Sequence, residues 1–405
     1  MNTPSLTGPR TTAHTAPGPP AAADLTRRTG EVAAVAARHL ARTDRDALFP
    51  VEALTAMRRT GLLGLLVPTS HGGLGGTVDD MISASITLGR TDTSVAMIFA
   101  MHCQQVAALV RHADDRLREE VLPEIAAGRT YLASVTTDTN TGGHLLTSDS
   151  VLTTTDDNRL RLDRFAPIVT GGRHADGFLI TMRSPAPASP HQVSLVYAHR
   201  DQLTAEPSGH WQPLGMRASH SIALHLTGTV PAHHVVGGHG GFRTVATQVF
   251  APMAHLGWSA CWLGTAAGAL SRVLTLLRDP AHRTRVDLGS ELLLTRLARA
   301  RQRIDTVHAL LERTRRACAT APDLSIPRVQ LLLNALKITA AEECHRAVED
   351  LIDAVGMRHG YLKDSPTRLE HALRDLRAAA LNYSNDRLRL ADGKLTLLDP
   401  QVRLD

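Results

Sequence analysis

The sequence has few aromatic residues, few lysines and no paired cysteines. The shortage of aromatic residues limits the kind of core, and the cysteine spacing bears on the compartment. Aromatic residues make up 3% of the 405 positions, so the core must consist mainly of Ala, Leu and Val. Ala and Leu are good helix formers. The four cysteines are widely spaced and form no CxxC pair, which argues against a disulfide framework and fits a reducing compartment. We therefore expect a largely helical, cytoplasmic protein.

The positive charge has no pattern typical of a nucleic-acid partner. The net charge of +5 comes almost wholly from arginine. Basic and acidic residues alternate along helical segments such as 296–315, and no recognition motif or aromatic–basic interleaving is present. We expect no nucleic-acid partner.

Two segments bear on targeting and membranes. Residues 1–22 are rich in Thr, Pro, Ala and Gly and contain no hydrophobic h-region, which predicts a disordered tail. The most apolar stretch, 250–277, carries His255, Ser259 and Arg272 at helical spacing. These polar residues favour a buried core helix, and we expect no membrane span.

Three zones follow the tail. In 23–128 the apolar residues recur every three or four positions, which predicts helices. In 129–240 alternating Thr, Val and Leu runs, divided by turn residues, predict strands. In 241–405 helical periodicity returns, and the segments 292–315 and 326–355 are long enough to pack as a bundle.

Three motifs occur in the order and spacing of the acyl-CoA dehydrogenase family, which the chain resembles. They are Gly61-Leu62-Leu63-Gly64 through Pro68 with His71-Gly72-Gly73-Leu74-Gly75-Gly76, then Leu214-Gly215-Met216-Arg217-Ala218-Ser219 with Val230-Pro231, and finally Gly360-Tyr361 with Leu369-Glu370-His371 and Leu373-Arg374-Asp375. The resemblance implies an α+β multidomain fold: an N-terminal helical domain, a central antiparallel β-barrel or sandwich domain, and a C-terminal four-helix bundle. It also implies bound FAD and a homodimer or homotetramer.

The resemblance also assigns flavin-binding positions. The family lines the ring with a "TE"-type strand end and a "WIT" strand, because reduction places negative charge that hydrogen-bond donors must meet. A family arginine that meets the FAD pyrophosphate across the subunit interface falls near Arg283, although a solvated loop arginine is an equal alternative. The cofactor-binding candidates are Val135, Thr136, Thr137, Gly142, Gly143, Ile168, Thr170, Arg283 and Asn385. By residue type alone, the threonines and glycines among them would be ordinary strand threonines and turn glycines.

The family's catalytic carboxylate is missing. Tyr383 stands at its usual position after Arg374-Asp375, with Ser384-Asn385 in place of Gly-Thr. The alternative position, at the start of the first long C-terminal helix, reads Ala251-Pro252-Met253-Ala254-His255 and holds no Asp or Glu. His102, His255 and Tyr383 remain as catalytic candidates, with Asp386 three residues displaced. A tyrosine is a poor base because its ordinary pKa is about 10.

These residues leave three functions open. The first is α,β-dehydrogenation of an acyl thioester, bound to CoA or to an acyl carrier protein, in a specialised pathway. The second is a flavin-dependent monooxygenase of the same fold, acting on a small molecule with a flavin reductase as partner; the missing carboxylate favours it. The third is a non-catalytic FAD-binding homologue.

Overall fold

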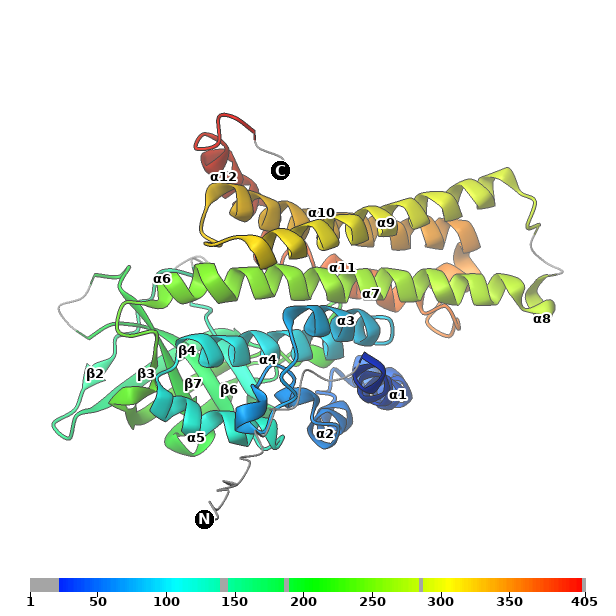
Figure 1. Cartoon of the computed structure of the whole chain (residues 1–405). Coiled ribbons are helices and arrows are strands. Elements are labelled where there is room, and N and C mark those ends of the chain that lie inside the picture. Colours follow the sequence, from blue (N-terminus) through cyan, green and yellow to red (C-terminus); the bar gives the residue numbers. More distant parts are fainter. Residues whose placement is uncertain (1–21, 139–144, 186–188, 284–286, 403–405) are drawn as a thin grey trace, which may run out of the picture.

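The structure, a computed structural model, describes residues 22–138, 145–185, 189–283 and 287–402. Helices come first along the chain, two four-stranded sheets follow, and long helices complete it (Figure 1). The expected order of a helical N-terminal domain, a central sheet region and a helical C-terminal domain is confirmed.

The N-terminal helices begin at residues that suit helix starts. Thr77 caps α3 through a reciprocal capping box with Asp80, and the Asp92 carboxylate accepts backbone N–H groups of the first turn of α4. Before α3, a Cβ added at Gly73 would lie 2.2 Å from the Val67 carbonyl oxygen, so the glycine-rich loop is a place where two backbones touch. The helices are α1 (Ala22–Asp46), α2 (Val51–Arg59), α3 (Val78–Gly89), α4 (Thr93–His112) and α5 (Asp115–Ala126).

The central region holds two sheets, with strand orders β1-β4-β5-β8 and β2-β3-β7-β6. Two details differ from the expected antiparallel barrel or sandwich. The β1–β4 pair is parallel, and the sheets are not closed into a barrel. The strands are β1 (Leu132–Val135), β2 (Thr153–Thr154), β3 (Arg159–Val169), β4 (Gly177–Arg183), β5 (Val193–His199), β6 (Leu203–Ser208), β7 (Ile222–Pro231) and β8 (Val235–Val236).

The C-terminal helices are long because their apolar stripes continue over many turns. Helices α7, α9 and α10 run side by side along most of their length (Figure 1). A π-helical segment at 246–250 separates α6 from α7, and such segments often mark functional sites. The helices are α6 (Phe242–Val245), α7 (Ala251–Arg278), α8 (Pro280–Arg283), α9 (Glu291–Thr320), α10 (Pro327–Gly356), α11 (Leu369–Arg377) and α12 (Asn385–Thr396).

Two helical stretches, 93–112 and 242–278, are long and apolar enough to cross a membrane by composition. However, 89% and 72% of their most apolar windows are buried inside the protein. Helix α7 contacts α3, α4, α9 and α10. Both stretches are therefore packed as core helices.

Candidate functional site

The second and third sequence motifs meet in one junction, together with α1. The Met216 backbone N–H donates to Asp375 Oδ1 at 2.6 Å, and Arg374 donates to the Leu214 carbonyl at 3.0 Å and to the Asp44 carboxylate at 2.7 Å. A Cβ on Gly215 would lie 2.0 Å from the Arg374 carbonyl oxygen. The junction thus joins α1, the central sheet region and α11 through contacts that need glycine and these charged groups.

The candidate flavin-facing strand ends lie beside each other. The Thr137 hydroxyl donates to the Ile168 carbonyl at 2.9 Å, and the buried guanidinium of Arg164 pairs with Asp138 and donates to the Thr137 carbonyl at 2.7 Å. The structure therefore brings together the two segments expected to hold the ring. Val135 is buried, so it can offer only backbone groups.

Thr170 lies at the start of a chain of hydrogen bonds that reaches α11. Its hydroxyl is 3.0 Å from that of Ser221, which is 2.9 Å from that of Ser219. The Ser219 N–H donates to the Met216 carbonyl, and Met216 in turn donates to Asp375. The position of the Thr170 hydroxyl is thus coupled to the junction.

These residues fit a flavin ring. Ile168 is 51% exposed although it is a large apolar residue within a strand, and the partly exposed Thr136, Thr137 and Thr170 lie close by in the chain. An apolar platform with nearby hydroxyl donors suits a flat aromatic ring that accepts hydrogen bonds. Gly142, Gly143 and the Arg283 side chain lie outside the described residues.

His102 is held by the backbone on both sides. The Leu132 N–H donates to Nδ1 at 3.1 Å, and Nε2 lies 2.9 Å from the Leu63 carbonyl, to which it donates in the neutral tautomer. Complete burial lowers its pKa to about 4. Both ring nitrogens are occupied, so His102 has the contacts of a residue that ties α4 to β1.

His255 differs because one of its ring nitrogens is free. Nδ1 is buried and has no hydrogen-bond partner within the part of the chain that the structure describes. Burial lowers the pKa to about 4; the nearby Lys337 lowers it further, and the Leu333 backbone opposes this. The imidazole is therefore neutral at pH 7.

Lys337 was missed by the sequence analysis and lies at the centre of this region. Its ammonium donates to the carbonyls of Ala379 and Tyr383, both at 3.0 Å, and to Asn385 Oδ1 at 2.7 Å. It also lies 5.7 Å from the centre of the Trp262 ring. The sequence does contain a feature that could have indicated this lysine. Lys337 stands among apolar residues of α10, in a sequence with few lysines.

Lys337 fixes the segment that carries Tyr383. Tyr383 has φ 49°, which is unusual for a bulky residue, and its carbonyl accepts from Lys337. Burial raises the pKa of its phenol, which therefore stays protonated. Asn385 is buried and also donates to Glu342 Oε1 at 3.1 Å, so its side chain faces α10. Asp386 has a 91% exposed side chain.

A cavity of about 510 Å³ adjoins the start of α7. This size lies within the usual range for small-molecule sites. Its apolar lining includes Leu66, Ala107, Val110, Pro252, Met253 and Leu256, and its polar lining includes Asp79, Arg111, Gln248 and Arg315. Arg315 is paired with Asp79 at 2.8 Å. An apolar wall with Arg111 at its edge suits a ligand that has an apolar part and an anionic part.

Sequence profiles of known families match both helical parts of the chain. "Acyl-CoA dehydrogenase, N-terminal domain" matches residues 26–129, and "Acyl-CoA dehydrogenase, C-terminal domain" matches residues 239–381. Together these matches cover more than half of the chain.

The chain belongs to the acyl-CoA dehydrogenase family. Members of this family are flavin-dependent oxidoreductases, so the family indicates an oxidoreductase with a flavin cofactor.

Relatives of this family member have different activities. It is 23% identical over 358 residues to "Probable acyl-CoA dehydrogenase fadE25" of Mycobacterium leprae, which covers 87% of this chain and 89% of the relative. Butyryl-CoA dehydrogenase of Megasphaera elsdenii shares the fold with a TM-score of 0.80 at 18% identity, covering 92% and 98% of the two chains. Dibenzothiophene monooxygenase TdsC of Paenibacillus sp. A11-2, solved with FMN, gives a TM-score of 0.81 at 19% identity, covering 93% and 97%. At these identities the structures show the fold alone.

Proposed function

We propose that this protein oxidises an acyl thioester, carried on CoA or on an acyl carrier protein, with FAD as cofactor. The family supports a flavin-dependent oxidation, and the cavity beside α7 supports a substrate with an apolar chain. In this proposal the acyl part occupies the apolar lining, and Arg111 lies near the anionic carrier. Thr136, Thr137 and Thr170 are among the residues that would hold FAD, which would supply the hydride acceptor for the β-carbon.

His255 carries the proposal. α,β-Dehydrogenation requires removal of the α-proton, and the two positions where the family places a carboxylate hold Tyr383 and the 251–254 segment instead. His255 begins the same helix and offers a neutral ring nitrogen without a partner among the described residues. We infer that Nδ1 accepts the α-proton. Its pKa of about 4 makes it a weak base, which predicts slow proton abstraction.

Lys337 and Tyr383 act in supporting roles. The Lys337 ammonium donates to the Tyr383 carbonyl, and in this proposal it fixes the segment that would face the reacting atoms. Because its phenol stays protonated, Tyr383 can donate a hydrogen bond to the thioester carbonyl and stabilise the charge that develops there. In this proposal the hydroxyls of Thr136 and Thr170 would donate to the flavin edge.

A second function follows from the same absence of a carboxylate. A flavin-dependent monooxygenase activates oxygen and needs no strong base for an α-proton. The weak basicity of His255 is compatible with this chemistry, which would use an external flavin reductase and a small-molecule substrate in the same cavity.

The test is an anaerobic titration of the purified flavoprotein with acyl thioesters of different chain lengths. The proposal expects bleaching of the flavin band. His255→Asn should slow bleaching on the order of 100-fold, the usual contribution of a general base. His225→Asn is the matched control: His225 pairs with Asp163 on an exposed part of the sheet and should leave the rate unchanged.

Other outcomes select the other functions. A flavin that ignores every thioester, but is reduced by an external reductase and reoxidised by oxygen during turnover of a small molecule, would establish the monooxygenase. A flavin that responds to neither would identify a non-catalytic FAD-binding homologue. Equal bleaching rates in the wild type and His255→Asn would remove His255 from the mechanism.

A further inference from the structure

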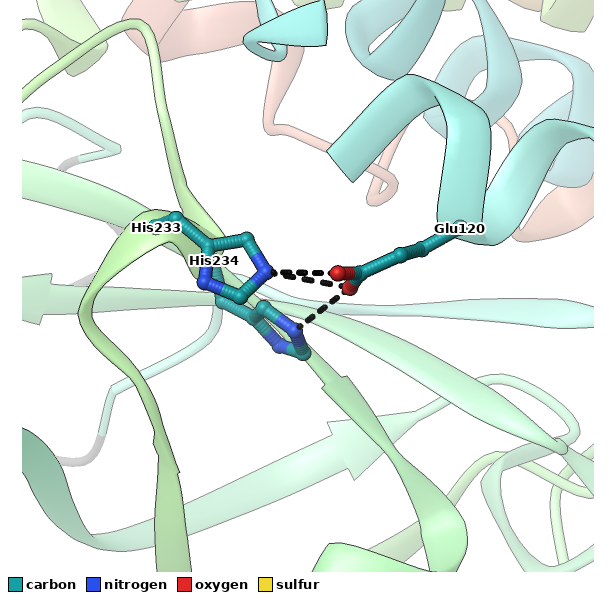
Figure 2. A group of neighbouring side chains, drawn as sticks. All are labelled: Glu120, His233 and His234. Atoms are coloured by element: carbon teal, nitrogen blue, oxygen red, sulfur yellow. Dashed lines mark hydrogen bonds and ion pairs between the residues drawn. The ribbon is translucent and has the colours of Figure 1, made fainter. Parts of the chain in front are cut away.

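Three side chains from two parts of the fold converge away from the residues discussed above. Glu120 comes from α5, and His233 and His234 come from the turn that follows β7; all three point towards one another (Figure 2). His233 Nε2 lies 3.1 and 3.0 Å from the two Glu120 oxygens, and His234 Nε2 lies 3.5 Å from Oε2. All three ligand atoms lie within 4.8 Å of one another.

These distances match the edges of a tetrahedral metal site. With metal–ligand bonds of about 2.0–2.1 Å, two ligands of a tetrahedral ion stand roughly 3.3–3.4 Å apart. The observed His–Glu separations lie on both sides of that value. The His–Glu edges therefore need only small side-chain adjustments to hold an ion.

The surroundings orient His234 as a ligand. Its Nδ1 lies 3.1 Å from the Tyr197 carbonyl, to which it donates, so the lone pair is on Nε2, the nitrogen that faces Glu120. A backbone carbonyl on the second ring nitrogen is the usual arrangement around metal-bound histidines. His234 is 4% exposed and His233 is 15% exposed at the side chain, so the rings are held by their packing.

The carboxylate is also oriented. Arg116 Nε donates to Glu120 Oε1 at 3.0 Å, which leaves Oε2 as the oxygen shared by both histidines. The Arg116 side chain is 71% exposed, so solvent screens much of its repulsion towards a cation.

We propose that Glu120, His233 and His234 bind one divalent transition-metal ion of the Zn²⁺ class, with water in the fourth position. Two imidazoles and one carboxylate favour such ions over Mg²⁺ and Ca²⁺, which prefer all-oxygen sites. The ion links α5 of the N-terminal helices to the turn between β7 and β8. Its role is structural: it fastens the N-terminal helical part to the central sheet region.

The test uses the full chain without a histidine tag, dialysed against a chelator and then titrated with Zn²⁺ by calorimetry and with Co²⁺ by visible absorption. We expect one tight site per chain, a tetrahedral Co²⁺ spectrum, and a Tm that rises with Zn²⁺ concentration because only the folded state binds. Mg²⁺ should produce none of these effects.

Variants decide whether the site is this cluster. Glu120→Gln and His233→Ala should each weaken Zn²⁺ binding by at least the roughly 10–100-fold that loss of a second-shell partner costs. Glu120 is partly exposed, so Glu120→Gln keeps the fold even if a histidine variant does not. His225→Ala removes another carboxylate-paired histidine and should bind as the wild type does. Equal affinity in all variants, or no saturable binding, would overturn the proposal.

Discussion

At the scale of single residues, the two buried histidines show why chemical type does not fix a role. His102 and His255 are both buried and both have a pKa lowered to about 4 by burial. They differ in their hydrogen bonds. His102 uses both ring nitrogens on backbone groups, whereas Nδ1 of His255 has no partner among the described residues.

The buried histidines predict how stability depends on pH. Their folded-state pKa lies below the unfolded value, so the unfolded chain binds protons first as pH falls from about 6.5 towards 4, and stability falls with it. The shift of His102 alone corresponds to roughly 3 kcal/mol of lost unfolding free energy across that range. Urea midpoints measured across this range should fall less steeply for His102→Asn. A parallel slope in the variant and the wild type would contradict this account.

At the scale of elements, the junction of Leu214–Ser219 with Arg374-Asp375 sets how the sheet region meets the C-terminal helices. Asp375 is buried and accepts the Met216 N–H. Arg374 reaches both Leu214 and Asp44. The same junction ends the hydrogen-bond chain from Thr170, so it also supports the strand end that carries Thr170.

Gly215 gives the sharpest test of the junction. Gly215→Ala places a Cβ against the Arg374 carbonyl, and because the obstacle is backbone, relief requires α11 to move. We expect destabilisation of more than about 4 kcal/mol, beyond the usual range for point changes, and weaker flavin retention. Gly30→Ala is the control: Gly30 is exposed on α1 with no atom near the added Cβ, and alanine there should stabilise by about 0.5–1 kcal/mol. Equal melting temperatures for the two variants would rule out the close contact.

At the scale of the whole molecule, the cofactor and the assembly are linked. If Arg283 contacts the FAD pyrophosphate across a subunit interface, as the family resemblance implies, flavin binding requires a second copy of the chain. We expect an assembly of two or four 43.6 kDa chains that releases FAD on denaturation.

Mass measurement in solution and chromatography of the released flavin test both points. Arg283→Ala should lower flavin content while the assembly keeps its size, and Arg278→Ala, at the end of α7, should change neither. Release of FMN, or full flavin content in a monomer, would contradict the prediction.

The sequence by itself determined the order of the domains, the long helices and the family. The apolar periodicity of 292–315 and 326–355 corresponds to α9 and α10, and the strand-like zone 129–240 contains β1 to β8. These features are local, because a helix or strand repeats its pattern within one segment. The motifs could be recognised in the sequence for a related reason. Close backbone contacts, such as that of Gly215 with Arg374, restrict which residue type can stand at a position.

Only the tertiary structure decided which candidate side chains have free atoms. It showed that backbone groups occupy both ring nitrogens of His102, that Nδ1 of His255 is buried without a partner among the described residues, and that Lys337 holds the Tyr383 segment. It also brought Glu120 together with His233 and His234, more than a hundred positions apart in the chain. Burial and hydrogen bonding depend on neighbours that are distant in sequence, so no pattern within one segment could specify them.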